Sequence, residues 1–301
     1  MRRKNSDPEP PFPPTISLKR DKSLRRLIEL LGVTLVVKAE ILAIGDELCY
    51  GRVYDTNSFW LADQLTLRGV LVQRITCIRD DEDEICSVLR DSVNRRPSFI
   101  FVTGGLGPTE DDKTLNALSK LSGRRVVVSE AVLKVMGERR KIPPDGLLPH
   151  HLKMSSTLEG AECLVNPLGW APVTILKLGD STVFVLPGPP REVQACFNEH
   201  LANRIQEATG HRSYAKRVFV TMNESELSSI VNEVSKAVEG VYLKPLVSEG
   251  SREQGLAVEI ISFDSAKERC LQRYEAALAK LKELVAQKGK TVLESPVFSC
   301  V

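Results

Sequence analysis

Three glycines and two carboxylates follow one short apolar run in this chain. Phe99–Val102 leads into Thr103-Gly104-Gly105-Leu106-Gly107, and Asp111 and Asp112 come shortly afterwards. Glycine lets a backbone turn sharply near a ligand, and the N–H groups at a helix start attract phosphate. Carboxylates beside such a turn suit a divalent metal. The stretch predicts a phosphate site with a metal, although acidic residues at a helix start also commonly act as caps.

A second acidic segment follows an earlier apolar run. Ala39–Ile44 is typical of a strand, and it leads directly into Gly45-Asp46-Glu47. Ligands of parallel sheets bind outside the carboxyl ends of the strands, so we expect this segment and the glycine-rich turn to line one cleft. Carboxylates crowded around an anionic ligand need a cation between them. We therefore predict a divalent metal held by Asp46, Asp111 and Asp112.

A third junction of strand, turn and helix is expected further along the chain. Leu186 leads into Pro187-Gly188-Pro189-Pro190, and Arg191 and Glu192 follow. A second phosphate at this helix start would pair with Arg191. The alternative is a helix that begins with proline and leaves Arg191 and Glu192 in solvent. The residues alone leave both interpretations open.

Composition excludes several classes of protein. The net charge of +2 gives no electrostatic case for nucleic acid, and no apolar run is long enough for a membrane helix. Seven scattered cysteines without a CxxC pair favour a reducing compartment, so we expect a cytoplasmic protein. We expect His150 and His151 to be surface residues, and Trp60 and Trp170 to serve as packing or as a pocket wall.

The elements expected around these residues have a regular order. Strands and helices alternate over residues 39–123, which predicts a parallel, doubly wound sheet. Residues 160–187 predict a β-rich insert with a hairpin turn at Gly179-Asp180. A boundary is expected near residue 210, followed by a βαββα pattern that suits a small ferredoxin-like domain. The expected domains are a disordered or accessory segment 1–37, an α/β domain 38–210 and a small α+β domain 211–301.

Several of these motifs together resemble one known family. Gly45-Asp46-Glu47-Leu48, Thr103 to Thr109 and Leu186 to Pro190 resemble the molybdopterin-binding (MoaB/Mog-like) domain, most closely in its competence/damage-inducible protein A (CinA) form. The resemblance covers roughly residues 38–205, and residues 211–295 resemble the small second domain of CinA-type proteins. Further matching positions are Gly51, Asn57, Asp111, Asp112, Thr114, Lys153, Asn166, Pro167, Gly169, Ala171, Pro172 and Glu192.

The resemblance implies a fold, a ligand and a reaction. The fold is a three-layer α/β/α sandwich that binds a nucleotide-like or pterin ligand, and it usually self-associates, so a dimer is expected. CinA-type domains resemble pyrophosphatases that split ADP-ribose into AMP and ribose 5-phosphate with Mg, Mn or Co, optionally with a monovalent cation. Relatives in molybdenum cofactor synthesis act on an adenylyl–pterin pyrophosphate. No Ser-Cys-Thr-Gly-Gly stretch occurs, so the amidase activity of many CinA proteins is not expected.

The leading hypothesis is metal-dependent hydrolysis of a nucleoside diphosphate-linked substrate. The alternatives are adenylyl transfer in molybdenum cofactor assembly and nucleotide binding without catalysis. Lys113 favours the last, because the family usually has an apolar residue there; Val173 also departs from the usual glycine. The expected catalytic residues are Asp46, Glu47, Asp111, Asp112 and Lys153. The expected ligand-binding residues are Gly45, Asn57, Thr103, Gly104, Gly105, Gly107, Thr109, Asn166, Pro187, Gly188 and Arg191.

Overall fold

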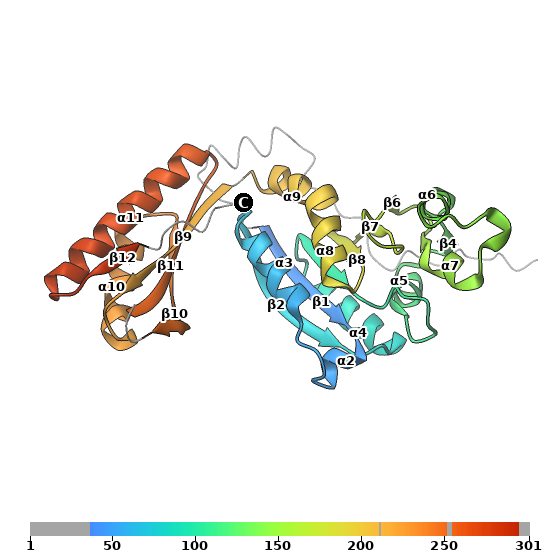
Figure 1. Ribbon diagram of the computed structural model, residues 1–301, viewed down its shortest axis with the longest axis horizontal. Helices are drawn as coiled ribbons and strands as arrows, with labels where there is room; N and C mark the ends of the chain where they lie inside the picture. The colour runs from blue at the N-terminus through green and yellow to red at the C-terminus, as the bar shows by residue number, and fades with distance from the viewer. Residues whose placement is uncertain (1–36, 211, 252–254, 295–301) are drawn as a thin grey trace, which may run out of the picture. The chain divides into compact units, whose positions relative to one another are not determined.

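The computed structural model describes residues 37–210, 212–251 and 255–294 of the chain (Figure 1). The described residues form two compact units. The first takes in the residues up to Arg204 apart from Gln64–Gly69, and the second takes in Gln64–Gly69 and the residues from Ile205 onward. The expectation for residues 1–36 lies outside the described residues. Within the described ranges, no helix combines the length and apolar character needed to cross a membrane.

A six-stranded sheet forms the centre of the first unit (Figure 1). The strands β2, β1, β3 and β8 are parallel. At one edge β7 pairs antiparallel with β8, and β6 pairs antiparallel with β7. The prediction of a mainly parallel sheet is confirmed. All five residues of β3 are buried, as expected for an apolar strand covered on both faces. In spatial order the strands are β2 (Val70–Ile78), β1 (Val37–Ile44), β3 (Phe99–Thr103), β8 (Ser181–Leu186), β7 (Val173–Leu178) and β6 (Glu162–Leu164).

Helices cover both faces of this sheet. On one face, Leu42 and Val102 of the sheet share a buried cluster with Leu89 of α4 (Glu82–Asn94) and Leu118 of α5 (Thr114–Ser122). The neighbouring residues of each strand point to the opposite face, because successive side chains of a strand alternate between the two faces.

The opposite face is aromatic. Phe101 stacks on Phe184, with ring centroids 4.9 Å apart, and lies 6.5 Å from Phe197. Phe197 begins the π-helical turn η2 (Phe197–Leu201), which continues α8 (Pro190–Cys196), and its ring meets Trp60 of α3 (Thr56–Thr66) edge to face. Helices therefore flank the sheet on two sides, and the predicted three-layer α/β/α architecture is confirmed.

The remaining elements of the first unit surround a small second core. Val132, Met136 and Trp170 form a buried cluster outside the main sheet. The hairpin turn predicted at Gly179-Asp180 is confirmed, with Gly179 in the left-handed region. The additional elements of this unit are α2 (Asp46–Cys49), β4 (Val126–Val128), α6 (Glu130–Arg140), the 3-10 turn η1 (Pro144–Gly146), α7 (Pro149–Met154) and β5 (Ser156–Leu158). The helix α9 (Ala202–Thr209) begins in the first unit and continues into the second from Ile205 onward.

The second unit is a four-stranded antiparallel sheet with two helices. Its strand order is β10-β11-β9-β12, and the chain order is βαββαβ. Val218, Ile230 and Leu281 belong to one buried cluster, so both helices pack on one face of the sheet. This is the predicted ferredoxin-like arrangement. Its elements are β9 (Arg212–Val220), α10 (Glu224–Ala237), β10 (Val241–Ser251), β11 (Gly255–Asp264), α11 (Lys267–Gln287) and β12 (Val292–Glu294).

A buried ion pair joins β1 to the end of α4. Glu40 is fully buried, and Arg95 donates from Nε and Nη2 to its two carboxylate oxygens, each at 2.7 Å. Burial alone raises the pKa of Glu40, but the hydrogen bonds and charge of Arg95 outweigh it, so the pKa lies below its ordinary value. The carboxylate is therefore charged at neutral pH and depends on Arg95.

Replacing Arg95 with methionine should leave that carboxylate buried without a partner. We expect Arg95→Met to lower the free energy of unfolding by about 3 kcal/mol at pH 7. This value is the low end of the range for a broken buried pair, and we choose it because the Arg95 side chain is 32% exposed. A lowered folded-state pKa stabilises the native protein above the unfolded-state pKa, and this contribution disappears as the pH falls. In the variant the pKa of Glu40 rises, so the deficit should shrink towards pH 5. Urea denaturation at both pH values measures this.

The matched control is Arg90→Met on the exposed face of the same helix. It should change the free energy of unfolding by less than about 0.5 kcal/mol. Equal losses in the two variants would show that the Glu40–Arg95 pair has no special role.

Candidate functional site

The glycine-rich turn after β3 is held between the ends of two other strands. Gly104 has φ +92°, and a Cβ atom there would collide with the backbone oxygen of Ile44 at the end of β1. Its N–H donates to the carbonyl of Leu186 at the end of β8, at 3.2 Å. Thr114 then fixes the turn, with Oγ1 donating to Gly104 O at 2.9 Å and N–H to Gly105 O at 3.2 Å. Only glycine fits at position 104.

Asp112 closes the same loop and does not open the helix. Its carboxylate accepts hydrogen bonds from the N–H of Gly107 at 2.7 Å and from the N–H and hydroxyl of Thr109 at 2.9 and 2.6 Å. The prediction that Asp111 and Asp112 lie at the start of α5 is wrong, because the helix begins at Thr114 after a turn that Asp112 stabilises.

Only one of the three glycine N–H groups expected to hold phosphate is available. The N–H of Gly104 and that of Gly107 donate within the protein. The N–H of Gly105 has no partner among the residues that the structure describes. Phosphate binding at this turn therefore depends on Gly105 and on groups outside the loop.

Asp46 connects the loops that follow β1 and β2. Its carboxylate accepts from Arg79 Nε at 3.0 Å, from Arg79 Nη2 at 3.3 Å and from the N–H of Asp80 at 3.2 Å. The N–H of Asp46 in turn donates to the Asp80 carboxylate at 2.9 Å. Hydrogen bonding to Arg79 keeps the pKa of Asp46 below its ordinary value. The guanidinium of Arg79 also lies over the Tyr50 ring, 5.0 Å from its centroid.

Sequence reasoning missed Arg79 and Asp80. The signal was present, because both residues directly follow β2 as Gly45 and Asp46 directly follow β1. In a parallel sheet these two strand ends are neighbours. The rule that placed Asp46 near the glycine-rich turn therefore applied equally to Asp80.

A cavity of about 470 Å³ lies against the glycine-rich turn; we call it the acidic cavity. No lysine or arginine is among its lining residues. The structure brings together here most residues predicted to bind ligand or metal, but Asp46 does not line the cavity. The lining carboxylates are Glu47, Asp55, Asp80, Asp111 and Asp112. The other predicted residues that line it are Gly45, Asn57, Thr103, Gly104, Gly105, Gly107 and Gly188.

The carboxylates of the acidic cavity differ in their electrostatic surroundings. Burial raises the pKa of Asp80, and the negative charges of Asp46 and Glu47 raise it further. The exposed Asp111 has a pKa below its ordinary value, because the polar Thr109 side chain, whose hydroxyl donates to Asp112, lies close to it and the positive charge of Lys153 lies near. Lys153 donates from Nζ to the Thr109 carbonyl. The surroundings of Asp111 thus favour its charged form.

The lining carboxylates are oxygen donors of the kind that hard metal ions prefer. Within the described ranges, no three His, Cys, Asp or Glu side chains are grouped to hold a metal by themselves. Mg²⁺ commonly binds one or two protein carboxylates and completes its shell with phosphate oxygens and water. Glu47, Asp80 and Asp111 face the cavity and fit this role. The predicted set of Asp46, Asp111 and Asp112 stays a prediction. The carboxylates of Asp46 and Asp112 already accept hydrogen bonds from the loops around them.

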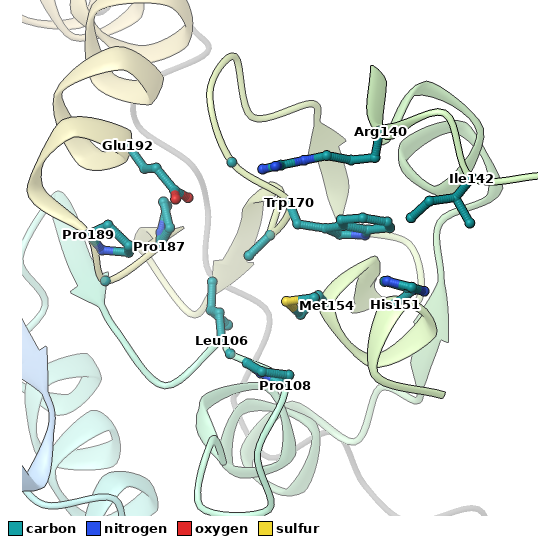
Figure 2. A pocket seen from close by; sticks show the side chains of 14 residues that line it. Leu106, Pro108, Arg140, Ile142, His151, Met154, Trp170, Pro187, Pro189 and Glu192 are labelled. Carbon is teal, nitrogen blue, oxygen red and sulfur yellow. The ribbon is translucent and has the colours of Figure 1, made fainter. Parts of the chain in front are cut away.

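A second cavity of about 650 Å³, the aromatic cavity, is lined in part by Leu106 and Pro108 of the same turn (Figure 2). Trp170 and His151 stack in its wall, with ring centroids 4.5 Å apart and planes 15° apart. The indole N–H donates to Ser155 Oγ at 2.6 Å. The expectation that Trp170 forms packing or a pocket wall is confirmed.

The prediction of surface histidines holds for His150, which is exposed, and in part for His151, which lines the aromatic cavity. Its ring is half-buried against Trp170, and its Nδ1 accepts the N–H of Leu148 at 3.0 Å. Burial lowers the pKa of His151, and the neighbouring His150 lowers it further. The imidazole is therefore neutral at pH 7. Two adjacent histidines in a sequence give no sign of a stacking partner that follows much later in the chain.

Asn166 shapes the loop that carries the aromatic wall. It is fully buried, and its Nδ2 donates to Ala171 O at 3.0 Å and to Glu192 Oε2 at 2.7 Å. Its Oδ1 accepts from the N–H groups of Leu168 and Gly169 at 2.9 and 2.8 Å. A Cβ atom at position 169 would collide with the Glu192 carboxylate. Every polar atom of the amide is used by the protein, so ligand contact by Asn166 stays a prediction.

The other predicted residues have different positions. Asn57 donates from Nδ2 to Gly188 O at 2.6 Å and so holds the turn before α8. Pro187 lines the aromatic cavity. Arg191 is exposed in the first turn of α8, and Lys113 is the N-cap of α5; neither lines either cavity.

The two cavities meet along a shared wall. Leu106, Gly107, Gly188 and Pro189 line both of them. All four belong to the turns that follow the neighbouring strands β3 and β8. The sequence motifs at these two strand ends therefore line two adjoining cavities.

The stretch that contains both cavities matches a known family. A model described as "Probable molybdopterin binding domain" matches residues 40–207. The chain belongs to this family. The predicted resemblance to the MoaB/Mog-like domain is thereby confirmed, and the match begins in β1 and extends beyond α8.

Individual proteins are also similar to this chain. A solved structure titled as the protein CinA with unknown function, from Thermoplasma acidophilum, is 30% identical, with a TM-score of 0.53 over 56% of this chain and 98% of that one. A Metallosphaera sedula protein is 34% identical over 257 residues, 84% of this chain and 96% of that relative. A Pyrobaculum aerophilum protein is 35% identical over 208 residues, 68% of this chain and 78% of that relative.

A methyl group at Gly104 should disturb this molybdopterin-binding domain far more than one at Gly188. Gly104→Ala combines a left-handed φ with a backbone collision, so we expect a loss of about 2–3 kcal/mol in the free energy of unfolding. In Gly188→Ala the nearest atom would be 3.7 Å away, an ordinary contact, and the loss should stay below about 1 kcal/mol. Urea denaturation compares the two. Similar losses in the free energy of unfolding of the two variants would contradict a steric restriction at Gly104.

Proposed function

We propose that this domain binds a ligand whose two halves are joined by a pyrophosphate, and that it hydrolyses this link with a divalent metal. The observation that carries the proposal is the shared wall of Leu106, Gly107, Gly188 and Pro189 between two cavities of different chemistry. A ligand lying across this wall has its middle at the glycine-rich turn and one half in each cavity.

The pyrophosphate would lie beside Gly105, whose N–H is available, and next to the carboxylates of the acidic cavity. A pyrophosphate and these carboxylates repel one another unless a cation lies between them. When bound, a divalent metal supplies that charge, polarises phosphoryl oxygens and makes bound water more acidic. Magnesium, manganese and cobalt are the candidates, with a monovalent cation as a further addition.

Hydrolysis adds one water across the P–O–P link. The water oxygen forms a bond to one phosphorus, the bond from that phosphorus to the bridging oxygen breaks, and each half leaves with one phosphate. Asp111 and Glu47, both lining the acidic cavity, would hold the metal and orient the water. Lys153, anchored on the Thr109 carbonyl near Asp111, would offset the negative charge that develops.

ADP-ribose is the first substrate to test, because the CinA-like motifs imply it. Incubation with ADP-ribose and magnesium, manganese or cobalt should give AMP, detected by chromatography. We expect Asp111→Asn to lower kcat about 100-fold, since a charged carboxylate at the reaction is removed. The free energy of unfolding should not change, because Asp111 is exposed.

Asp145→Asn is the matched control for Asp111→Asn. Asp145 is exposed in η1 and lines neither cavity, so its activity should equal that of the parent protein. Absence of AMP with every metal would reject the hydrolase proposal.

Adenylyl transfer in molybdenum cofactor assembly is the second candidate. The family match and the stacked wall of Trp170 and His151 favour it, because a flat pterin ring suits such a wall. This candidate predicts tight molybdopterin binding in calorimetry together with inertness towards ADP-ribose. Weak molybdopterin binding would exclude it.

Nucleotide binding without catalysis is the third candidate. The sequence favours this candidate through Lys113, whose positive charge is expected to take the place of the metal. Lys113 does not line the acidic cavity, however. Binding of ADP-ribose without turnover under any metal would favour it. Self-association stays a proposal for all three candidates, and light scattering after size-exclusion chromatography measures it.

A further inference from the structure

Two exposed thiols lie on segments that are bonded to each other at the edge of the acidic cavity. Cys49 is the last residue of α2, which follows β1, and Cys77 is the last but one residue of β2. Of the cysteines that the structure describes, only these two are exposed. The end of β1 is joined to the end of β2, because the N–H of Gly45 donates to the carbonyl of Ile78 at 3.0 Å.

The contacts of Arg79 indicate that the two thiols face each other. Its guanidinium binds the Asp46 carboxylate, with Nε 3.0 Å from Oδ1, and lies over the Tyr50 ring, 5.0 Å from the centroid. Residues 46, 49 and 50 share one face of α2, because residues three and four apart on a helix are neighbours. Residues 77 and 79 point to one side, because extended residues alternate in direction. Cys49 therefore lies on the face of α2 that meets the side of β2 carrying Cys77.

The electrostatic surroundings of Cys77 agree with this placement. Burial raises the pKa of its thiol, and the negative charges of Asp55 and Cys49 raise that pKa further. The Cys77 thiol also donates to Asp55 Oδ2 at 3.8 Å. Cys77 is thus close enough to Cys49 to respond to its charge, as two thiols that react with each other must be.

We propose that Cys49 and Cys77 form a dithiol site that exchanges with low-molecular-weight disulfides and closes reversibly into a disulfide bond, which fixes one wall of the acidic cavity. The inference goes beyond the proposed function, because it requires neither a metal nor hydrolysis. A disulfide between exposed cysteines is of the labile kind that reducing thiols reopen.

The chemistry consists of two successive thiol–disulfide exchanges. The thiolate of one cysteine attacks a sulfur of the external disulfide, the S–S bond of that molecule breaks, and the half that leaves takes up a proton. The second cysteine then attacks the protein sulfur of the mixed disulfide and releases the other half. Two protein thiols are oxidised, one external disulfide is reduced to two thiols, and these thiols carry the two protons that the cysteines lose.

The disulfide acts on the cavity through the chain on either side of Cys49. Residues both before and after this cysteine line the acidic cavity, namely Glu47, Leu48, Val53, Tyr54 and Asp55. A cross-link from Cys49 to β2 restricts local opening of this segment, because its ends are then held to the sheet. Oxidation thus makes this wall of the cavity more rigid.

Oxidised glutathione tests the site in the full chain with Cys300→Ser, which removes a thiol outside the described residues. The intact mass should fall by about 2 Da, because two hydrogen atoms leave, and dithiothreitol should restore it. After blocking with N-ethylmaleimide and digestion with trypsin, the peptide of residues 39–52 should be joined to that of residues 75–79.

Single cysteine variants separate this pair from the other thiols. Cys49→Ser and Cys77→Ser should each lose the cross-link and hold glutathione on the remaining cysteine of the pair. Cys163→Ser is the matched control, because it removes a partly buried thiol of β6, and it should retain the cross-link.

The cross-link should also slow the cleavage of the folded protein by trypsin after Arg52. Arg52 is exposed between Cys49 and Val53, and cleavage there needs local opening of the chain. We expect the oxidised protein to be cut after Arg52 about tenfold more slowly than the reduced protein, as measured on reducing gels. In Cys77→Ser, which cannot close the pair, oxidised glutathione should change this rate by less than about twofold.

Three outcomes would each overturn the inference: no cross-link between the two peptides, a preferred cross-link to another cysteine, or equal cleavage after Arg52 in the oxidised and reduced protein. Failure to make AMP from ADP-ribose would reject the hydrolase proposal and leave this inference standing. AMP production without the cross-link would do the reverse.

Discussion

The passage of the backbone between two strand ends at Gly104 is the constraint on which the rest of the site depends. The carbonyl of Ile44 leaves no space for a side chain, and the N–H of Gly104 is bonded to the carbonyl of Leu186. The turn after β3 is thereby fixed against the ends of β1 and β8 at once. Because the turn is fixed on both sides, it can serve as a common wall for two separate cavities.

Several carboxylates near this turn hold the surrounding loops in place through hydrogen bonds. Asp112 accepts hydrogen bonds from the N–H groups of Gly107 and Thr109. Asp46 accepts hydrogen bonds from the Arg79 guanidinium and from the N–H of Asp80. A loop with few apolar contacts needs such bonds, because unpaired backbone donors are costly to bury. A cluster of acids in a sequence therefore overstates the number of carboxylates that reach a ligand.

The parts of the structure that were predictable rest on local patterns. The position of β3 follows from an apolar run, and α5 ends where Gly123 adopts the left-handed conformation. The acidic cavity was partly foreseeable, because the strand-end rule brings separate segments together. The stacking of His151 on Trp170 was not, because it depends on the irregular chain between α6 and β7, where no periodic pattern fixes the spacing.

The shared wall of the two cavities has a thermodynamic consequence. An occupant of one cavity contacts Leu106 and Pro189 from one side and so restricts the same residues that an occupant of the other must meet. Binding in the two cavities is then linked, and the linkage is reciprocal: each occupant changes the affinity of the other by the same factor. In the proposed hydrolysis one ligand becomes two, and the affinity for each product would then depend on whether the other is still bound.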